Sequence, residues 1–65
     1  MKIEINGQAQ EVAADNLHDL VAELGLTAAR IATAVNGEFV PSSARATRPL
    51  AEGDRVEVLS PMQGG

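Results

Sequence analysis

Residues 16–25, Asn-Leu-His-Asp-Leu-Val-Ala-Glu-Leu-Gly, carry the strongest helical pattern of this chain and decide its fold class. Their apolar side chains recur at helical spacing, on one face of an amphipathic helix: Leu17, Leu20, Val21 and Leu24. Asn16 is a favourable N-cap, and Asp19 complements the positive end of the helix dipole. Gly25 suits the left-handed residue that often ends a helix. We therefore predict a helix over residues 17–24.

On the N-terminal side of this helix, the hydrophobic period changes to that of a strand. Ile3 and Ile5 alternate with polar residues, as in a strand with one buried face. Asn6-Gly7 follows, and this dipeptide suits a two-residue type I′ turn because both positions need a positive φ. Residues 8–12 form the return strand, so residues 1–12 are predicted to be a β-hairpin.

The C-terminal side of the helix also has the pattern of strands. Three more are predicted at residues 31–35, 38–40 and 55–59. Asn36-Gly37 marks a turn between the first two, and Pro41 ends the second because proline cannot continue a hydrogen-bonded ladder. Residues 42–50 are expected to cross the molecule without regular structure, and residues 52–54 to turn into the last strand.

The predicted order is two strands, one helix and three strands, which is an α+β pattern. The helix then lies on one face of a mixed sheet of four to five strands. The apolar face of that sheet should meet the helix through Ile3, Ile5, Val12, Ile31, Val35, Val56 and Val58. The prediction is one domain over residues 1–60 and a C-terminal tail over residues 61–65.

Composition argues against several classes of site. The 65-residue chain has no cysteine, which excludes disulfides, thiolate metal sites and cysteine nucleophiles. The single histidine, His18, cannot form an imidazole metal site alone, so neither a metal nor a catalytic residue is predicted. A net charge of −4 with five basic residues argues against nucleic-acid binding. No stretch approaches the roughly 18 apolar residues of a membrane helix. With no secretory signal pattern either, we expect a cytoplasmic protein without membrane contact.

The remaining chemical feature is the end of the chain, Gly64-Gly65. A C-terminal carboxylate is ionised at neutral pH and is therefore a poor electrophile. Adenylation by ATP would convert it into a mixed anhydride, and a sulfur nucleophile could then displace AMP to leave a thiocarboxylate. Glycine does not obstruct a narrow channel, and residues 61–65 would reach at most roughly 16–18 Å when extended. The residues alone leave two interpretations open: an inert end, or an end that enters another enzyme.

The stretch over residues 34–65, AVNGEFVPSSARATRPLAEGDRVEVLSPMQGG, resembles the ThiS sulfur carriers of thiamine biosynthesis. The matching elements are Asn36-Gly37, Val40-Pro41, Pro49-Leu50, the EGDRVEV segment of residues 52–58 and the terminal Gly-Gly. The N-terminal KIEINGQ and the NLHDLVAELGL helix also fit, so the resemblance covers nearly the whole chain. Ser42 and Arg45 depart from it, because the family often carries an arginine and an aromatic residue there.

The resemblance implies the ubiquitin-like β-grasp fold and a carrier rather than an enzyme. A ThiF-type adenylyltransferase would adenylate Gly65, and sulfur would arrive from cysteine through a desulfurase persulfide. The thiocarboxylate would then donate its sulfur to thiazole synthase (ThiG). Gln63 and Gly64 would enter the partner's active site together with Gly65. The carrier itself would bind no cofactor, because the activating partner uses the ATP.

Partner docking is expected through exposed apolar groups beside the tail, namely Leu59, Pro61 and Met62. Leu59 is out of phase with the inward valines of the last strand and should face away from the helix. Phe39, the only aromatic residue, could belong to the core or to the docking surface, and the core is the favoured interpretation. Three alternatives remain at this point: the small subunit of molybdopterin synthase, a non-catalytic interaction domain with an inert tail, and a ubiquitin-like modifier that forms an amide with a target lysine.

Overall fold

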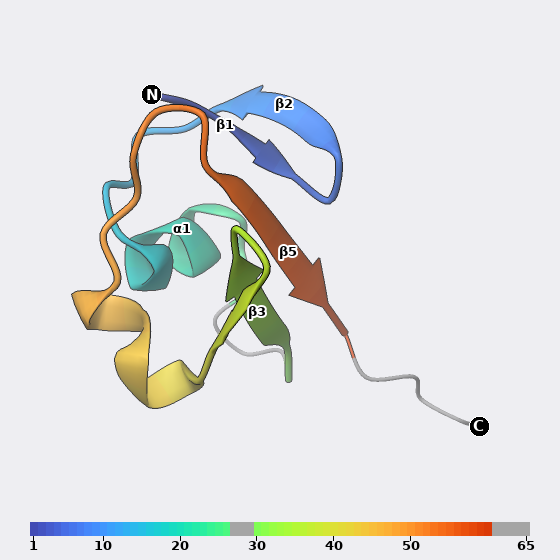
Figure 1. The fold of residues 1–65 in the computed structure, drawn as a ribbon. Coiled ribbons are helices and arrows are strands. Elements are labelled where there is room, and N and C mark those ends of the chain that lie inside the picture. The colour runs from blue at the N-terminus through green and yellow to red at the C-terminus, as the bar shows by residue number, and fades with distance from the viewer. Residues whose placement is uncertain (27–29, 61–65) are drawn as a thin grey trace.

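The computed structural model describes residues 1–26 and 30–60 of the chain (Figure 1). The strands are β1 (Lys2–Ile5), β2 (Gln8–Glu11), β3 (Ala32–Val35), β4 (Glu38–Val40) and β5 (Arg55–Leu59). The helices are the α-helix α1 (Leu17–Glu23) and the 3-10 helix η1 (Ser42–Thr47). The strands form one sheet in the order β2-β1-β5-β3-β4, with β1 and β5 parallel and the other neighbours antiparallel. The predicted mixed sheet packed on one helix is confirmed.

Both β-hairpins turn through an Asn-Gly pair. The φ angles are 51° and 84° at Asn6 and Gly7, and 51° and 86° at Asn36 and Gly37. A positive φ at both central residues is the type I′ geometry, whose twist matches that of the flanking strands. The two turns predicted at these dipeptides are therefore confirmed.

The helix α1 begins and ends close to its predicted bounds. The Asn16 side-chain oxygen accepts a hydrogen bond from the backbone N–H of Asp19 at 2.8 Å, which is the expected N-cap. The helix ends at Glu23, one residue earlier than predicted, and Leu24 forms its C-cap. Gly25 has a φ of 75°, so it takes the left-handed conformation that its position indicated.

The core lies between α1 and one face of the sheet. The largest fully buried side chains are Ile3, Leu17, Leu20, Val35, Val56 and Thr33. Of the predicted sheet face, Ile31 and Val58 are only partly buried, and the other members are buried. Ala14, Val40 and Leu50, which were not assigned to the core, are also buried in it. Burial of the helix stripe against the sheet is thus the main source of stability in the part of the chain that the structure describes.

Two further predictions differ from the structure. The segment expected to be irregular contains η1, whose six residues include no buried side chain. Because its most buried residues, Ala44 and Arg45, are only partly buried, no hydrophobic period marks it in the sequence. Phe39 is 68% exposed, so its assignment to the core was wrong. Side chains alternate across a strand, and in β4 the neighbouring Val40 takes the inward position.

Candidate functional site

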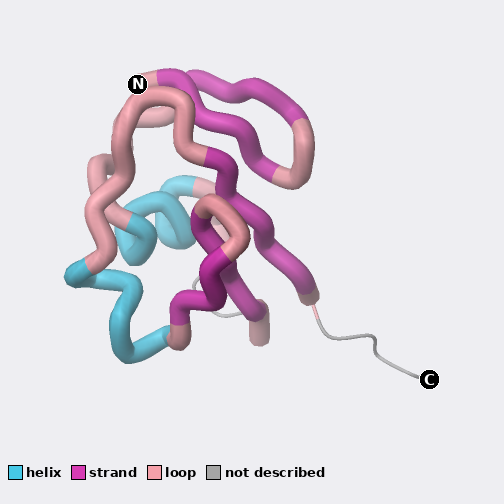
Figure 2. Tube along the Cα trace, viewed as in Figure 1, coloured by secondary structure: helices cyan, strands magenta, loops and turns pink. Residues whose placement is uncertain are grey.

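The candidate site lies at the C-terminal end of β5, the strand that leads to the Gly-Gly end of the chain. β5 is the middle strand of the sheet and is paired with β1 on one side and β3 on the other. Its pairing with β3 continues to its last residue, Leu59, which lies opposite Ala32. In Figure 2, β5 crosses the molecule and ends on the side away from the N-terminus. A strand hydrogen-bonded on both sides is a fixed anchor for the residues that follow it.

A turn asparagine extends the support of β5 beyond the end of β1. The backbone N–H of Val58 donates to Asn6 Oδ1 at 2.8 Å, and Asn6 Nδ2 donates to the carbonyl of Val58 at 3.0 Å. The side-chain amide thus acts as one more backbone partner on the β1 side. At the start of β5, Asn36 Oδ1 accepts from the backbone N–H of Arg55 at 3.0 Å. Sequence reasoning assigned these asparagines to turns and missed these contacts, which span 52 and 19 positions.

Exposed apolar side chains gather on the face of the sheet opposite α1. Leu59 is 65% exposed and Phe39 is 68% exposed. Leu59 lies opposite Ala32, and Phe39 lies opposite Ala34, so the pairing of β5, β3 and β4 places all four on one face. We call these four residues the outer apolar patch. The expectation that Leu59 faces away from the helix is confirmed, whereas its docking role stays a prediction.

A surface pocket of about 470 Å³ adjoins this patch at the end of β5. Its lining comprises Arg30, Ile31, Ala32, Ser42, Arg45, Leu59 and Ser60. We call it the tail-root pocket, because Ser60 is the last residue that the structure describes before the Gly-Gly end. The other residues predicted to act in docking or tail entry, Pro61, Met62, Gln63, Gly64 and Gly65, lie outside the described residues.

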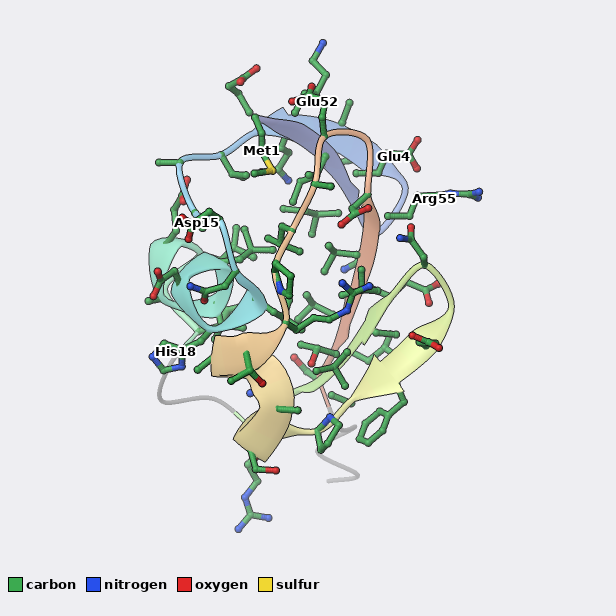
Figure 3. The ribbon with its side chains drawn as sticks, turned by 60° about the vertical axis from the view of Figure 1, so that its left-hand side comes forward. Met1, Glu4, Asp15, His18, Glu52 and Arg55 are labelled. Atoms are coloured by element: carbon green, nitrogen blue, oxygen red, sulfur yellow. The ribbon has the colours of Figure 1, made fainter. Side chains whose placement is uncertain are left out.

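Other kinds of site have little support. His18 projects from α1 away from the rest of the protein (Figure 3). Among the described residues, no group of three or more His, Cys, Asp or Glu side chains is placed to hold a metal ion. In the same part of the chain, no helix is long and apolar enough to cross a membrane. The C-terminal end of β5 is therefore the candidate functional site.

The sequence matches the model of the ThiS family over residues 3–65. It is 33% identical over 61 residues to the sulfur carrier protein ThiS of Thermus thermophilus, covering 94% of this chain and 95% of that protein. It is also 33% identical over 66 aligned positions to a thiazole synthase of Paramagnetospirillum magneticum. That alignment covers all of this chain but only 20% of the relative, so the chain spans about a fifth of that protein's length.

Solved structures show the same architecture. The crystal structure of a ThiS from Geobacter metallireducens superposes with a TM-score of 0.84 at 30% identity and covers 100% of both chains. The solution structure of a thiamine biosynthesis protein from the same organism gives a TM-score of 0.80 at 29% identity, covering 100% of this chain and 88% of that one. The five-stranded sheet packed on the α-helix α1 is thus the predicted β-grasp fold.

Proposed function

Since the chain belongs to the ThiS family and is a sulfur carrier of the ThiS type, we propose that its sulfur is carried on the terminal carboxyl group of Gly65. The observation that supports this most strongly is the family match, which runs from residue 3 through both terminal glycines. The chain has no cysteine, so it offers no thiol of its own to hold sulfur. If sulfur is instead added to an activated carboxyl carbon, the carrier needs no thiol of its own.

The proposed chemistry has two steps, both on partner enzymes. In the first, a carboxylate oxygen of Gly65 attacks the α-phosphorus of ATP, pyrophosphate leaves and an acyl adenylate forms. In the second, hydrosulfide released from a cysteine desulfurase persulfide by a thiol reductant attacks the carbonyl carbon, AMP leaves and a thiocarboxylate remains. A ThiF-type adenylyltransferase binds the ATP. The carrier is then a co-substrate of other enzymes, with no bound cofactor and no catalysis of its own.

The fold supports this role by fixing one end of the tail. β5 is paired with β3 from Val56 to Leu59 and with β1 at Arg55 and Val56, and the Asn6 amide holds Val58 on the edge that β1 no longer covers. Five residues beyond Ser60 would reach at most roughly 16–18 Å when extended. The body of the carrier can therefore stay outside a partner while the terminal carboxylate reaches the active site. Gln63 and Gly64 would occupy the partner's channel to that active site, where glycine is the least obstructive residue because it has no side chain.

The acceptor of the sulfur is proposed to be a thiazole synthase. One stretch of the thiazole synthase of Paramagnetospirillum magneticum is similar to the whole of this chain. That protein carries a sequence of this kind within a much longer chain, which supports a shared reaction between the two parts. For the present chain the same chemistry would occur between separate molecules, with the carrier bound by a ThiG-type enzyme.

Docking to these partners is proposed to use the outer apolar patch together with Pro61 and Met62. Interfaces are enriched in aromatic anchors, and Phe39 supplies the only aromatic side chain of this chain. The Phe39 side chain is 68% exposed, so it is not part of the core. It presents a large apolar surface next to Ala34. Leu59 extends the patch to the last residue of β5.

Pyrophosphate exchange tests the activation step. The chain is incubated with a ThiF-type adenylyltransferase, ATP and labelled pyrophosphate, and label incorporated into ATP is counted. We expect exchange that depends on the carrier and disappears when Gly65 is deleted, with an unchanged melting temperature. Exchange that continues without Gly65 would assign activation to another group. Covalent conjugates to lysines of other proteins, seen on a denaturing gel, would favour a modifier instead.

A further inference from the structure

The tail-root pocket combines apolar walls with two guanidinium groups. Ile31, Ala32 and Leu59 provide the apolar lining, and Arg30 and Arg45 provide the charges. Arg30 is exposed and Arg45 is partly buried. A pocket of this composition resembles the centre of a protein–protein interface, where apolar contact is combined with arginine. A small inorganic anion would leave its apolar walls uncovered.

Arg45 is held in place before any partner arrives. Its Nε donates to the hydroxyl of Thr33 at 3.0 Å, and its Nη2 donates to the carbonyl of Ile31 at 2.9 Å. Thr33 is 1% exposed and in turn donates to the carbonyl of Val40 at 2.8 Å, so the guanidinium is tied to buried structure. An arginine has five N–H donors, and these bonds use two. The other three N–H groups of Arg45 are therefore held in a fixed orientation. This fixed orientation lowers the entropic cost of binding a carboxylate.

The charges of the pocket are not neutralised by the protein's own acidic side chains. All nine Asp and Glu residues lie in the described part of the chain. The only salt bridge found there joins the Met1 amine to Glu11 at 3.3 Å, at the opposite end of the molecule. Figure 3 shows Met1 and Glu52 together at that end. None of the five Lys and Arg residues, all of which lie in the described part of the chain, makes a salt bridge there, and two of the five lie together at the root of the tail.

We propose that the tail-root pocket receives a carboxylate-bearing apolar segment at the mouth of the adenylating enzyme's tail channel. The apolar part of that segment would pack on Ile31 and Leu59, and its carboxylate would bind Arg45 and Arg30. This inference rests on the proposed function and adds the chemistry of the partner surface.

Activation is the step that most needs such a contact. The terminal carboxylate must approach ATP, which is also an anion, so bringing the reacting groups together is opposed by like charge. Binding energy from a remote part of a substrate can offset such a cost. The tail-root pocket is remote from the carboxyl group yet lies where the partner must surround the chain.

The test measures pyrophosphate exchange by the full chain with a ThiF-type adenylyltransferase, over a range of carrier concentrations. Arg30→Glu is the main variant because the side chain is exposed and its replacement should not disturb folding. Lys2→Glu makes the same change of charge on an exposed residue at the far end of β1. We expect Arg30→Glu to raise the KM for the carrier about ten-fold with little change in kcat, whereas Lys2→Glu changes the KM less than about two-fold.

A second variant and the salt dependence complete the test. Arg45→Gln, with its fold checked by thermal melting, should also raise the KM. Added KCl should raise the KM of the wild-type chain more than that of Arg30→Glu. Equal KM values for Arg30→Glu and Lys2→Glu would overturn the proposal. So would normal exchange by both arginine variants together with slower sulfur donation to thiazole synthase. A wild-type chain that gives no exchange at all would instead remove the proposed function itself.

Discussion

The same leucine-to-alanine substitution at two positions should separate residues that stabilise the fold from residues that bind partner enzymes. Leu20 lies on α1 and is fully buried, whereas Leu59 ends β5 and is 65% exposed. Leu20→Ala removes core contacts far from the tail. Leu59→Ala shortens a side chain of the outer apolar patch and of the tail-root pocket. We expect the first to lower stability and the second to lower the affinity for partner enzymes.

The expected magnitudes follow from burial. Truncating a fully buried leucine to alanine costs about 2–5 kcal/mol, because apolar transfer is lost and a cavity remains. A domain of this size has a total stability of roughly 3–10 kcal/mol, so the loss for Leu20→Ala is a large share of it. A melting temperature lower by at least about 8 °C follows from 2 kcal/mol. For Leu59→Ala we expect no more than about 1 kcal/mol, since most of that side chain is already in water.

Thermal unfolding followed by circular dichroism, and pyrophosphate exchange, measure the two effects. Leu59→Ala should keep the wild-type melting temperature within a few degrees while its KM as a carrier rises about five-fold or more. Leu20→Ala, assayed well below its melting temperature, should keep a near wild-type KM. If Leu20→Ala melted with the wild type, the assignment of the helix stripe to the core would be wrong. A normal KM for Leu59→Ala would remove it from the docking surface.

Three further substitutions test separate parts of the structure. Asn6→Gly keeps the turn conformation but removes both side-chain hydrogen bonds to Val58. We therefore expect the free energy of unfolding to fall by about 1–3 kcal/mol and the Val58 amide hydrogen to exchange faster. An unchanged exchange rate at Val58 would contradict the role of the Asn6 amide. Thr33→Val should destabilise by about 1–3 kcal/mol because it removes the buried hydroxyl that donates to the Val40 carbonyl and accepts from Arg45 Nε. Thr47→Val, which loses an exposed hydroxyl contact, should have a much smaller effect in chemical denaturation. Gly64→Val should reduce kcat/KM in pyrophosphate exchange with an unchanged melting temperature, and wild-type exchange rates would show that the passage for the tail is wide.

The regular elements could be predicted because their signals are local. The leucine stripe of residues 17–24 and the two Asn-Gly dipeptides each specify a backbone conformation within a few residues. These signals, together with the alternation of residues 55–59, were enough to give the α+β class and the order of elements. The last strand was predicted with its observed bounds, Arg55–Leu59.

The missed features depend on contacts between distant parts of the chain. The 3-10 helix η1 is polar on its surface, and Arg45 ties it to the start of β3 through Thr33 and the Ile31 carbonyl. The Asn6 amide reaches across to Val58 only because β1 and β5, far apart in sequence, are neighbours in the sheet. The exposure of Phe39 follows from the side of the sheet that β4 presents to the core, where Val40 takes the buried position.

The mass of the intact carrier after reaction tests most directly whether sulfur is carried on the terminal carboxyl group of Gly65. The chain is incubated with ATP, a ThiF-type adenylyltransferase, a cysteine desulfurase, cysteine and a thiol reductant, and its C-terminal peptide is then sequenced by mass spectrometry. We expect a mass increase equal to the replacement of one oxygen by sulfur, confined to the final residue, Gly65, and lost on incubation with thiazole synthase and its other substrates. An unchanged mass, or sulfur located anywhere else in the chain, would contradict it.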